Sequence, residues 1–462
     1  MKKIQILLGN GARKAACLLL CMMVCLSVCI PGATAPTVSA ATFSIDFDLQ
    51  SEGVILVNLD TGITVFEKNA DKRLEPASIT KIMTYAVVCD HVEDLENTKV
   101  VVSANVDREL TGTGSSVAGV KTGEELTVWE LLNLMMVPSG NDAALALAEY
   151  VGGGDWHKFV DMMNEKAEEL GCQDTHFANP HGLHDANHYT TARDMALISQ
   201  YALDLPGFTE VTNQKYYTLR ATNIVKEPRT VYSTNLMLNQ NLESGKYYYQ
   251  YAKGIKTGSH DQAGRCLVSM AVKNGYSYLC VAMGCPYYKE DGSLNEHGEM
   301  LDSRNLYEWA FKNLEMTSVV KQGDPQGEVD LEYAWNKDTL QVVASKDFNT
   351  ILPASIKSSS IVVKTQLPES VEAPIEKGQK IGTATLSYAG QVLTTIDLVS
   401  AESVERSNVL HTMNQVENVV TSTWFIVVAC IIAGLLILYI ILALLYNRRK
   451  KKLKQVKKYR RM

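Results

Sequence analysis

The sequence predicts a mixed α/β (α+β) domain, then a small all-β domain, then one membrane-spanning helix near the C-terminus. Three observations carry this prediction. Helical and strand patterns are mixed from residue 42 to about residue 315, and short strand-like runs separated by Gly and Pro fill residues 316–401. An uncharged apolar stretch then covers residues 424–446, long enough to cross a bilayer as a helix. The length of 462 residues allows two or three domains.

Two β-hairpins are expected in the mixed domain. Ile55–Leu59 and Thr64–Phe66 flank a turn built around Gly62. Leu267–Val272 and Tyr276–Met283 flank an Asn-Gly pair, which strongly favours a tight hairpin turn.

Helices are expected where apolar periodicity follows a start signal. Thr127 and Glu130 form a capping box, and the helix they begin should end before Pro138. Thr191 with Asp194 marks another helix start. Two further helices are expected over Ser78–His91 and Asn141–Val151.

The region after about Met316 contains only short strand patterns, which indicate an all-β domain of roughly ninety residues. The expected strands are Leu340–Ala344, Ile361–Thr365, Thr383–Tyr388 and Val392–Val399. Residues 402–423 are predicted to form a polar stalk or juxtamembrane helix.

The N-terminal residues 1–40 have the composition of a secretory signal peptide. A basic start precedes an apolar run from Ala15 to Ile30, and the small residues Val38-Ser39-Ala40 suit a cleavage site. A retained N-terminal anchor is the alternative, but the apolar run is short for a bilayer span.

The C-terminal span at Trp424–Tyr446 is followed at once by basic residues, beginning with Arg448 and Arg449. The positive-inside rule therefore predicts a cytoplasmic tail at residues 447–462 and an extracellular catalytic domain on a single-pass membrane protein.

The charge is strongly uneven along the chain. The formal net charge is −7, but fourteen basic and no acidic residues lie in segments 1–40 and 447–462. Without them the exported part carries −21. Such a surface argues against nucleic acid or anionic lipid as its partner.

The cysteines do not indicate a disulfide-stapled scaffold. The exported part keeps an odd number without tight spacing: Cys89, Cys172, Cys266, Cys280 and Cys285. One pair could form, and the sequence leaves open which.

A Ser-x-x-Lys pattern at Ser78 and Lys81 is the first candidate for chemistry. Positions three apart share a helix face, so the amine can reach the hydroxyl. A serine becomes a nucleophile when a base removes its proton, and a lysine with a lowered pKa can be that base. Ser318 and Lys321 match the same pattern, and the pattern alone is equally typical of an exposed helix face.

Two companion motifs separate Ser78 from its copy. Ser139 and Asn141 lie in a turn between two expected helices, straight after Pro138. Lys256-Thr257-Gly258 precedes the Asn-Gly hairpin, where a Lys and a Thr on a strand edge can hold a carboxylate and the Gly admits substrate backbone. The similar Lys121-Thr122-Gly123 is expected to be a turn.

These three motifs, in this order, resemble those of the β-lactamases and penicillin-binding proteins. The chain resembles low-molecular-weight penicillin-binding proteins, which are serine-type D-alanyl-D-alanine carboxypeptidases. Further matching segments are Gly114-Ser115-Ser116, His181-Gly182-Leu183, Tyr189–Asp194, Ser233-Thr234-Asn235-Leu236 and, in the tail domain, Ala373–Gln379. The resemblance covers roughly residues 42–405 and implies the β-lactamase/penicillin-binding-protein transpeptidase fold.

The resemblance also implies roles for individual residues. Ser78 is the acylated nucleophile and Lys81 its general base, while Ser139 and Asn141 shuttle the proton and orient the peptide. Lys256 and Thr257 bind the terminal carboxylate, Gly258 belongs to the same motif, and the N–H groups of Ser78 and Ser259 form the oxyanion hole.

The implied substrate is a peptidoglycan stem peptide ending in D-Ala-D-Ala, and β-lactams are the implied inhibitors. No cofactor or metal is required. Ser259-His260 follows the Lys-Thr-Gly where many relatives have an aromatic residue or His next to the Gly, which leaves the side-chain contacts there open.

Four alternatives remain at this point. A DD-endopeptidase that cleaves cross-links is the nearest, and a β-lactamase or a non-catalytic wall-binding protein is more remote. A zinc peptidase could use His181, His184 and His188, with His176 and Asp185 nearby, although no His-Glu-x-x-His helix is present.

Overall fold

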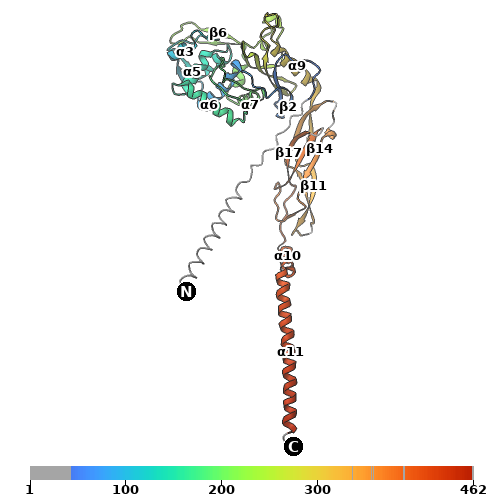
Figure 1. Cartoon of the computed structure of the whole chain (residues 1–462). Coiled ribbons are helices and arrows are strands. Elements are labelled where there is room, and N and C mark those ends of the chain that lie inside the picture. Colours follow the sequence, from blue (N-terminus) through green and yellow to red (C-terminus); the bar gives the residue numbers. More distant parts are fainter. Residues whose placement is uncertain (1–42, 336, 355, 357, 389–390, 460–462) are drawn as a thin grey trace, which may run out of the picture. The chain divides into compact units, whose positions relative to one another are not determined.

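The computed structural model describes residues 43–335, 337–354, 356, 358–388 and 391–459 (Figure 1). The predicted signal peptide and its cleavage site lie outside the described residues.

The elements before the C-terminal β-rich region are β1 (Gly53–Asn58), β2 (Ile63–Lys68), η1 (Ala77–Thr80), α2 (Lys81–His91), β3 (Lys99–Val101), α3 (Ala104–Leu110), β4 (Glu125–Thr127), α4 (Val128–Met136), α5 (Asn141–Val151), α6 (Trp156–Glu169), α7 (Ala192–Leu203), α8 (Phe208–Thr212), β5 (Tyr216–Leu219), β6 (Arg229–Tyr232), η2 (Leu236–Leu238), η3 (Glu243–Gly245), β7 (Ala252–His260), β8 (Gly264–Lys273), β9 (Tyr276–Cys285) and α9 (Gly298–Asn313).

The centre of this region is a five-stranded antiparallel sheet with the strand order β2-β1-β9-β8-β7. Successive side chains of a strand point to opposite faces. In β1, Ile55 and Val57 therefore join the core that contains α2 and α7, whereas Val54 and Leu56 join the core beneath α9. The sheet is thus covered by helices on both faces, and β7 is left as an edge strand.

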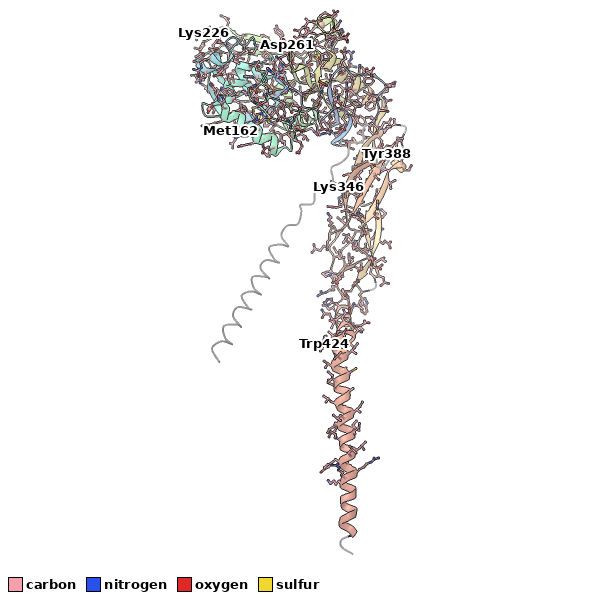
Figure 2. All side chains as sticks on the ribbon, in the orientation of Figure 1. Met162, Lys226, Asp261, Lys346, Tyr388 and Trp424 are labelled. Atoms are coloured by element: carbon pink, nitrogen blue, oxygen red, sulfur yellow. The ribbon has the colours of Figure 1, made fainter. Side chains whose placement is uncertain are left out.

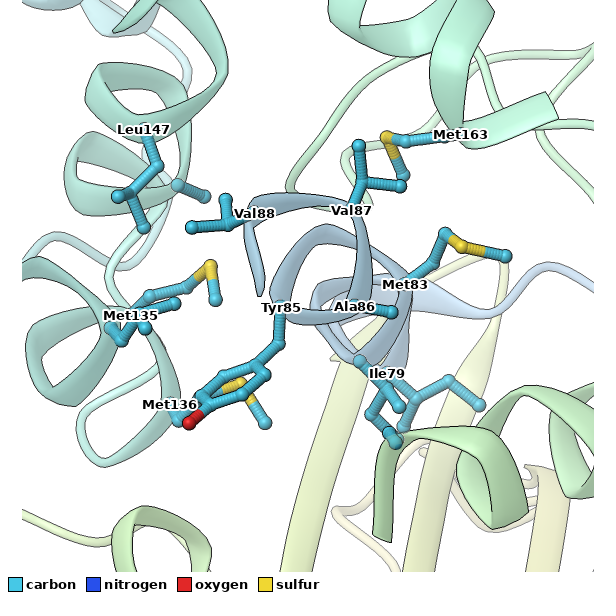
Figure 3. Packing of buried hydrophobic residues seen from close by; sticks show 14 of the residues in the cluster. Ile79, Met83, Tyr85, Ala86, Val87, Val88, Met135, Met136, Leu147 and Met163 are labelled. Carbon is cyan, nitrogen blue, oxygen red and sulfur yellow. The ribbon is translucent and has the colours of Figure 1, made fainter. Parts of the chain in front are cut away.

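Helix α2 is apolar on nearly every side, which is typical of a helix buried in a core. Its residues from Lys81 to Val88 are all buried. Figure 3 shows the side chains of Tyr85 and Val88 beside Met135 and Leu147 of α4 and α5. This packing holds the start of α2, and with it Ser78, in a fixed place.

The predicted hairpins and helix starts of this region are confirmed. Thr127 and Glu130 form the expected capping box, and Thr191 caps α7 by accepting from the N–H of Asp194. One detail differs: Ser78 lies in the short 3-10 helix η1, and the α-helix begins only at Lys81.

The C-terminal β-rich region consists of β10 (Leu314–Val320), β11 (Pro325–Glu332), β12 (Thr339–Ala344), β13 (Phe348–Pro353), η4 (Ser358–Ser360), β14 (Val362–Gln366), β15 (Ser370–Glu372), β16 (Lys380–Tyr388) and β17 (Gln391–Ser400). Six strands form a sheet in the order β14-β16-β17-β12-β11-β15, labelled in part in Figure 1, and β10 pairs with β13. Lys346 and Tyr388 belong to this region (Figure 2). The four strands predicted from the sequence are all present.

Two helices end the described chain, α10 (Asn408–Thr421) and α11 (Thr423–Tyr459). The segment Thr423–Lys450 of α11 is long and apolar enough to cross a membrane. Trp424 lies at its start (Figure 2). Amphipathic Trp rings are enriched at the membrane–water boundary, so its position suits a membrane-spanning helix.

The five cysteines of residues 43–423 form no disulfide among the residues that the structure describes. Cys89, Cys172, Cys266, Cys280 and Cys285 are all free thiols.

Candidate active site

The side chains of Ser78 and Lys81 meet at the junction of η1 and α2. The Lys81 Nζ lies 2.9 Å from the Ser78 Oγ. It also donates to the Asn141 Oδ1 at 2.7 Å and to the His181 carbonyl oxygen at 2.7 Å. With three oxygen partners and no exposed surface, this amine is held in one position.

The environment of Lys81 disfavours its charged form. Burial lowers the pKa of Lys81 well below its usual range, and the nearby Lys256 ammonium lowers it further, while the Asp142 carboxylate opposes the shift. A buried lysine of this kind is available as a neutral amine, which a general base requires.

The turn between α4 and α5 brings Ser139 and Asn141 to the same place. Ser139 is buried and has a φ of +65°, a conformation that costs free energy for a residue with a Cβ. Asp142, the residue after Asn141, stabilises this turn through hydrogen bonds to a neighbouring segment. Its carboxylate accepts from the N–H groups of Ala118, Gly119 and Val120 at 2.8–2.9 Å.

The edge strand β7 supplies Lys256, Thr257, Gly258 and Ser259. Lys256 is buried, its Nζ donates to the Thr257 carbonyl oxygen at 3.0 Å, and burial lowers the pKa of Lys256 to about 7. The hydroxyls of Thr257 and Thr234 lie 2.5 Å apart.

Gly258 has a different reason for being glycine than the sequence suggested. A Cβ at this position would lie 2.8 Å from the Ser78 backbone nitrogen and 2.9 Å from the Pro76 carbonyl oxygen. The close approach that requires glycine is therefore between β7 and the protein's own η1, and it sets the spacing between the two motifs.

One cavity of about 200 Å³ joins most of these groups. It is lined by Ser78, Ser116, Ser139, Thr234, Thr257, Gly258, Ser259, Arg265, His297, Glu299 and Met300. Asn141, Lys81 and Lys256 lie buried next to it rather than in its lining. All eight residues proposed from the sequence are thus brought to one place.

The sequence did not single out Thr234, Arg265, His297 or Glu299 as site residues. Thr234 was visible only within the Ser-Thr-Asn-Leu segment. Arg265 reaches the cavity because β8 pairs it with Ser259. Its guanidinium donates to the Asn295 carbonyl oxygen and contacts the His297 ring, which in turn bonds the Glu299 carboxylate at 2.8 Å. Only strand register and the start of α9 bring these groups together.

The histidines of the proposed zinc cluster have separate partners. His188 accepts from the Ala178 N–H at Nδ1, so its Nε2 carries the proton and donates to the Thr80 hydroxyl at 2.8 Å. His184 bonds the Glu75 carboxylate, and His176 bonds the Asn187 carbonyl oxygen. Burial, strengthened by nearby Lys81, holds the pKa of His181 well below its usual range. These side chains brace the loop that faces Ser78.

Comparison with known proteins defines the family. The D-alanyl-D-alanine carboxypeptidase family (peptidase family S11) matches residues 37–286, more than half of the chain, and the chain belongs to this family. The family is one of serine peptidases, which overturns the zinc alternative. The C-terminal domain of penicillin-binding protein 5 matches residues 314–406.

Individual relatives agree with this assignment. The chain is 30% identical over 360 residues to the D-alanyl-D-alanine carboxypeptidase DacF of Bacillus subtilis, covering 78% of this chain and 87% of that protein. Among solved structures, penicillin-binding protein 5 from Haemophilus influenzae aligns with a TM-score of 0.64 at 27% identity, over 79% of this chain and all of that one. The DacD carboxypeptidase from Francisella tularensis aligns with a TM-score of 0.61 at 26% identity, over 80% of this chain and 97% of that one. The predicted penicillin-binding-protein fold is confirmed.

Proposed function

We propose that this chain is a serine-type D-alanyl-D-alanine carboxypeptidase that removes the terminal D-Ala from peptidoglycan stem pentapeptides. The observation that carries the proposal is the contact of 2.9 Å between the Ser78 Oγ and the Nζ of a buried lysine with a lowered pKa. The same cavity holds the hydroxyls of Thr234 and Thr257, which suit a substrate carboxylate.

Acylation begins with Lys81 in its neutral form. The Nζ lone pair accepts the Ser78 hydroxyl proton while the Oγ attacks the carbonyl carbon of the penultimate D-Ala. The peptide C–N bond then breaks, and the proton passes to the leaving amine of the terminal D-Ala. Ser139 and Asn141 lie where they can relay this proton and hydrogen-bond the peptide amide.

The negative charge that develops on the carbonyl oxygen needs fixed donors. We assign this role to the backbone N–H groups of Ser78 and Ser259, which belong to η1 and β7. Gly258 supports it indirectly, because the absence of a Cβ lets β7 approach the Ser78 backbone. The terminal carboxylate is assigned to Thr257, with the positive charge of Lys256 behind it.

Water then attacks the acyl carbon, and one of its protons passes to the Lys81 Nζ. As the ester bond to Ser78 breaks, Lys81 returns this proton to the Ser78 Oγ, which restores the hydroxyl and the neutral amine. β-Lactams are expected to acylate Ser78 in the same way and to remain attached longer, which suits the family to which the chain belongs.

The terminal segments suggest where the reaction occurs. We assign residues 1–40 to a cleaved signal peptide, residues 42–315 to the catalytic domain and residues 316–401 to the β-rich domain. Residues 402–423 form the juxtamembrane stalk, residues 424–446 the span and residues 447–462 a cytoplasmic tail. The basic residues after the apolar part of α11 support this orientation, with the catalytic domain outside the cell.

The test is to incubate the full chain in detergent with a pentapeptide ending in D-Ala-D-Ala and to follow free D-Ala by mass spectrometry. We expect release by the wild type and none by Ser78→Ala. Absence of release by the wild type, or equal release by both proteins, would contradict the mechanism.

The same reaction run on cross-linked peptide dimers tests the endopeptidase alternative. A carboxypeptidase leaves the cross-link intact and removes only a terminal D-Ala. Cleavage of the cross-link at a comparable rate would assign the chain to the endopeptidases instead.

A further inference from the structure

A band of connected hollows lies beside α9, apart from the Ser78 cavity. Three hollows of about 200, 710 and 480 Å³ follow one another. The first and second share Tyr248, Tyr249 and Gln250, and the second and third share Asn305, Glu308 and Lys312. Neighbouring hollows thus border the same side chains, and we call the three together the α9 groove.

The α9 groove is rich in aromatic side chains. The loop before β7 contributes Tyr248 and Tyr251 to its lining, and α9 contributes Trp309. All three are only partly buried, so part of each ring faces the groove or the solvent. Flat aromatic faces between planar polar groups such as Asn305 and Gln250 suit the apolar faces and hydroxyls of sugar rings.

The groove is also basic, although the exported part of the chain is acidic. Its lining contains Lys215, Lys253, Lys273, Arg304 and Lys312. The acidic residues in its lining are Asp46 and Glu308. A local excess of positive charge on a chain segment of net charge −21 favours an anionic ligand.

These basic side chains are not already neutralised. None of the five forms a salt bridge within the part of the chain that the structure describes. The Lys273 Nζ instead lies over the Tyr251 ring, 5.0 Å from its centroid, and Arg304 donates to the Lys246 carbonyl oxygen. Lys215, Lys253 and Lys312 are exposed.

Helix α9 connects the groove to the proposed catalytic cavity. Met300, in the first turns of α9, lines that cavity, and Arg304 and Lys312 of the same helix line the groove. At 1.5 Å per residue, these positions lie about 6 and 18 Å further along the helix axis. A five-residue stem peptide spans about 17 Å when extended. Measured along α9 from Met300, the groove thus begins within the span of one stem peptide, which suits a sugar chain that carries a peptide bound at Ser78.

We propose that the α9 groove binds the glycan strand of peptidoglycan, with sugar rings on its aromatic side chains and the carboxylates of uncleaved stem peptides on its lysines and arginine. This inference rests on the proposed function, because the proposed function identifies peptidoglycan as the substrate polymer. The groove would favour peptides attached to strands over free peptides.

The test compares two variants of the full chain in nanodiscs, each with the same change of charge. Lys253→Gln/Lys312→Gln removes two exposed cations of the groove. Lys158→Gln/Lys226→Gln removes two exposed lysines elsewhere in the catalytic domain. Tyr248→Ala provides an aromatic variant. Sedimentation with pentapeptide-bearing glycan strands measures binding, in a Ser78→Ala background that prevents turnover.

We expect Lys253→Gln/Lys312→Gln to weaken strand binding about fivefold, and Tyr248→Ala to weaken it as well, with no change in the Lys158→Gln/Lys226→Gln control. With Ser78 intact, D-Ala release from strands should fall while release from the free pentapeptide stays at the wild-type rate. This second rate keeps the two proposals separate, because a wrong reaction assignment would abolish release from the free peptide in the wild type.

Equal strand binding by the groove variant and its control would overturn the proposal. The proposal would also be overturned if inorganic polyphosphate competed for strand binding as well as soluble strands do, because the groove would then be a general anion site.

Discussion

The chain contains the pattern Ser-x-x-Lys at Ser78 and at Ser318, and the two copies have opposite surroundings. At Ser78 the serine and lysine share a face and their polar atoms lie 2.9 Å apart. Ser318 lies on the strand β10 and pairs with Asn349. The pairing register shifts between Ser318 and Val320, Lys321 lies just past the end of β10, and the side chains of Ser318 and Lys321 are both exposed. The second copy thus has neither the contact nor the burial.

The two regions that hold these copies differ in the same way. The catalytic region buries Lys81, Lys256, Glu124 and Asp142, whereas the buried polar residues of the β-rich region are Thr350 and Ser400, as far as the structure describes it. Burial of a charge costs free energy unless partners compensate for it. Among the described residues, buried charge therefore belongs to the catalytic region, partly at the site (Lys81, Lys256) and partly in structural pairs such as Glu124 with Arg229, and the β-rich core is apolar.

The largest expected effect separates the two serines. Ser78→Ala should lower kcat/KM for D-Ala release by about 10⁴-fold or more and abolish covalent labelling by a fluorescent penicillin, because the nucleophile is gone. Ser318→Ala should change neither. Labelling that survives in Ser78→Ala would place the nucleophile elsewhere.

The two lysines give the next contrast. Lys81→Met should lower kcat by about 10²- to 10⁴-fold, because the Ser78 hydroxyl loses its base. The methionine side chain fills a volume similar to that of lysine. Lys321→Met serves as the matched control and should retain wild-type kinetics. Circular dichroism confirms that both variants fold; a folded Lys81→Met with wild-type kcat would remove lysine from the mechanism.

Lys256 is expected to make stability depend on pH. Its pKa of about 7 in the folded chain lies below the unfolded value of about 10.4, so the unfolded state binds more protons between these values. The cost of burying this lysine is greatest below pH 7 and is relieved as the pH rises from about 7 towards 10.4. Lys256→Met should therefore have a higher free energy of unfolding than the wild type at pH 7. As the pH rises, this difference should shrink by up to about 1.4 kcal/mol per pH unit.

Urea unfolding at pH 7, 8 and 9 measures this effect. Lys321→Met, which replaces an exposed lysine, should show a constant difference from the wild type over the same range. A constant difference for Lys256→Met too would mean that this amine stays charged in the folded chain.

The smallest expected effect concerns Thr234, which the sequence did not single out. Thr234→Val removes a hydroxyl next to Thr257 and should raise KM for the pentapeptide about threefold to tenfold, with little change in kcat, because one hydrogen bond near the carboxylate is lost. Thr230→Val is the matched control, since Thr230 and Thr218 form a similar hydroxyl pair at 2.9 Å on the β5–β6 hairpin. A lower kcat with an unchanged KM would argue against a role in carboxylate binding.

The sequence by itself determined the local elements and the order of the motifs. The capping box at Thr127 and the Asn274-Gly275 hairpin are local interactions, so they can be recognised without the fold. The sequence also placed Ser78, Ser139 and Lys256 in one family pattern, because the three motifs occur in the family's order along the chain.

Only the tertiary structure decided which groups share the site and what state they are in. The lowered pKa of Lys81 depends on burial by α4, α5 and the His181 loop, and on Lys256, which is 175 positions away in the sequence. Gly258 is glycine because of the backbone of Ser78, and Arg265 reaches the cavity through strand register. These are long-range effects of packing and desolvation. The same four-residue pattern therefore forms a candidate nucleophile at Ser78 and an exposed strand at Ser318.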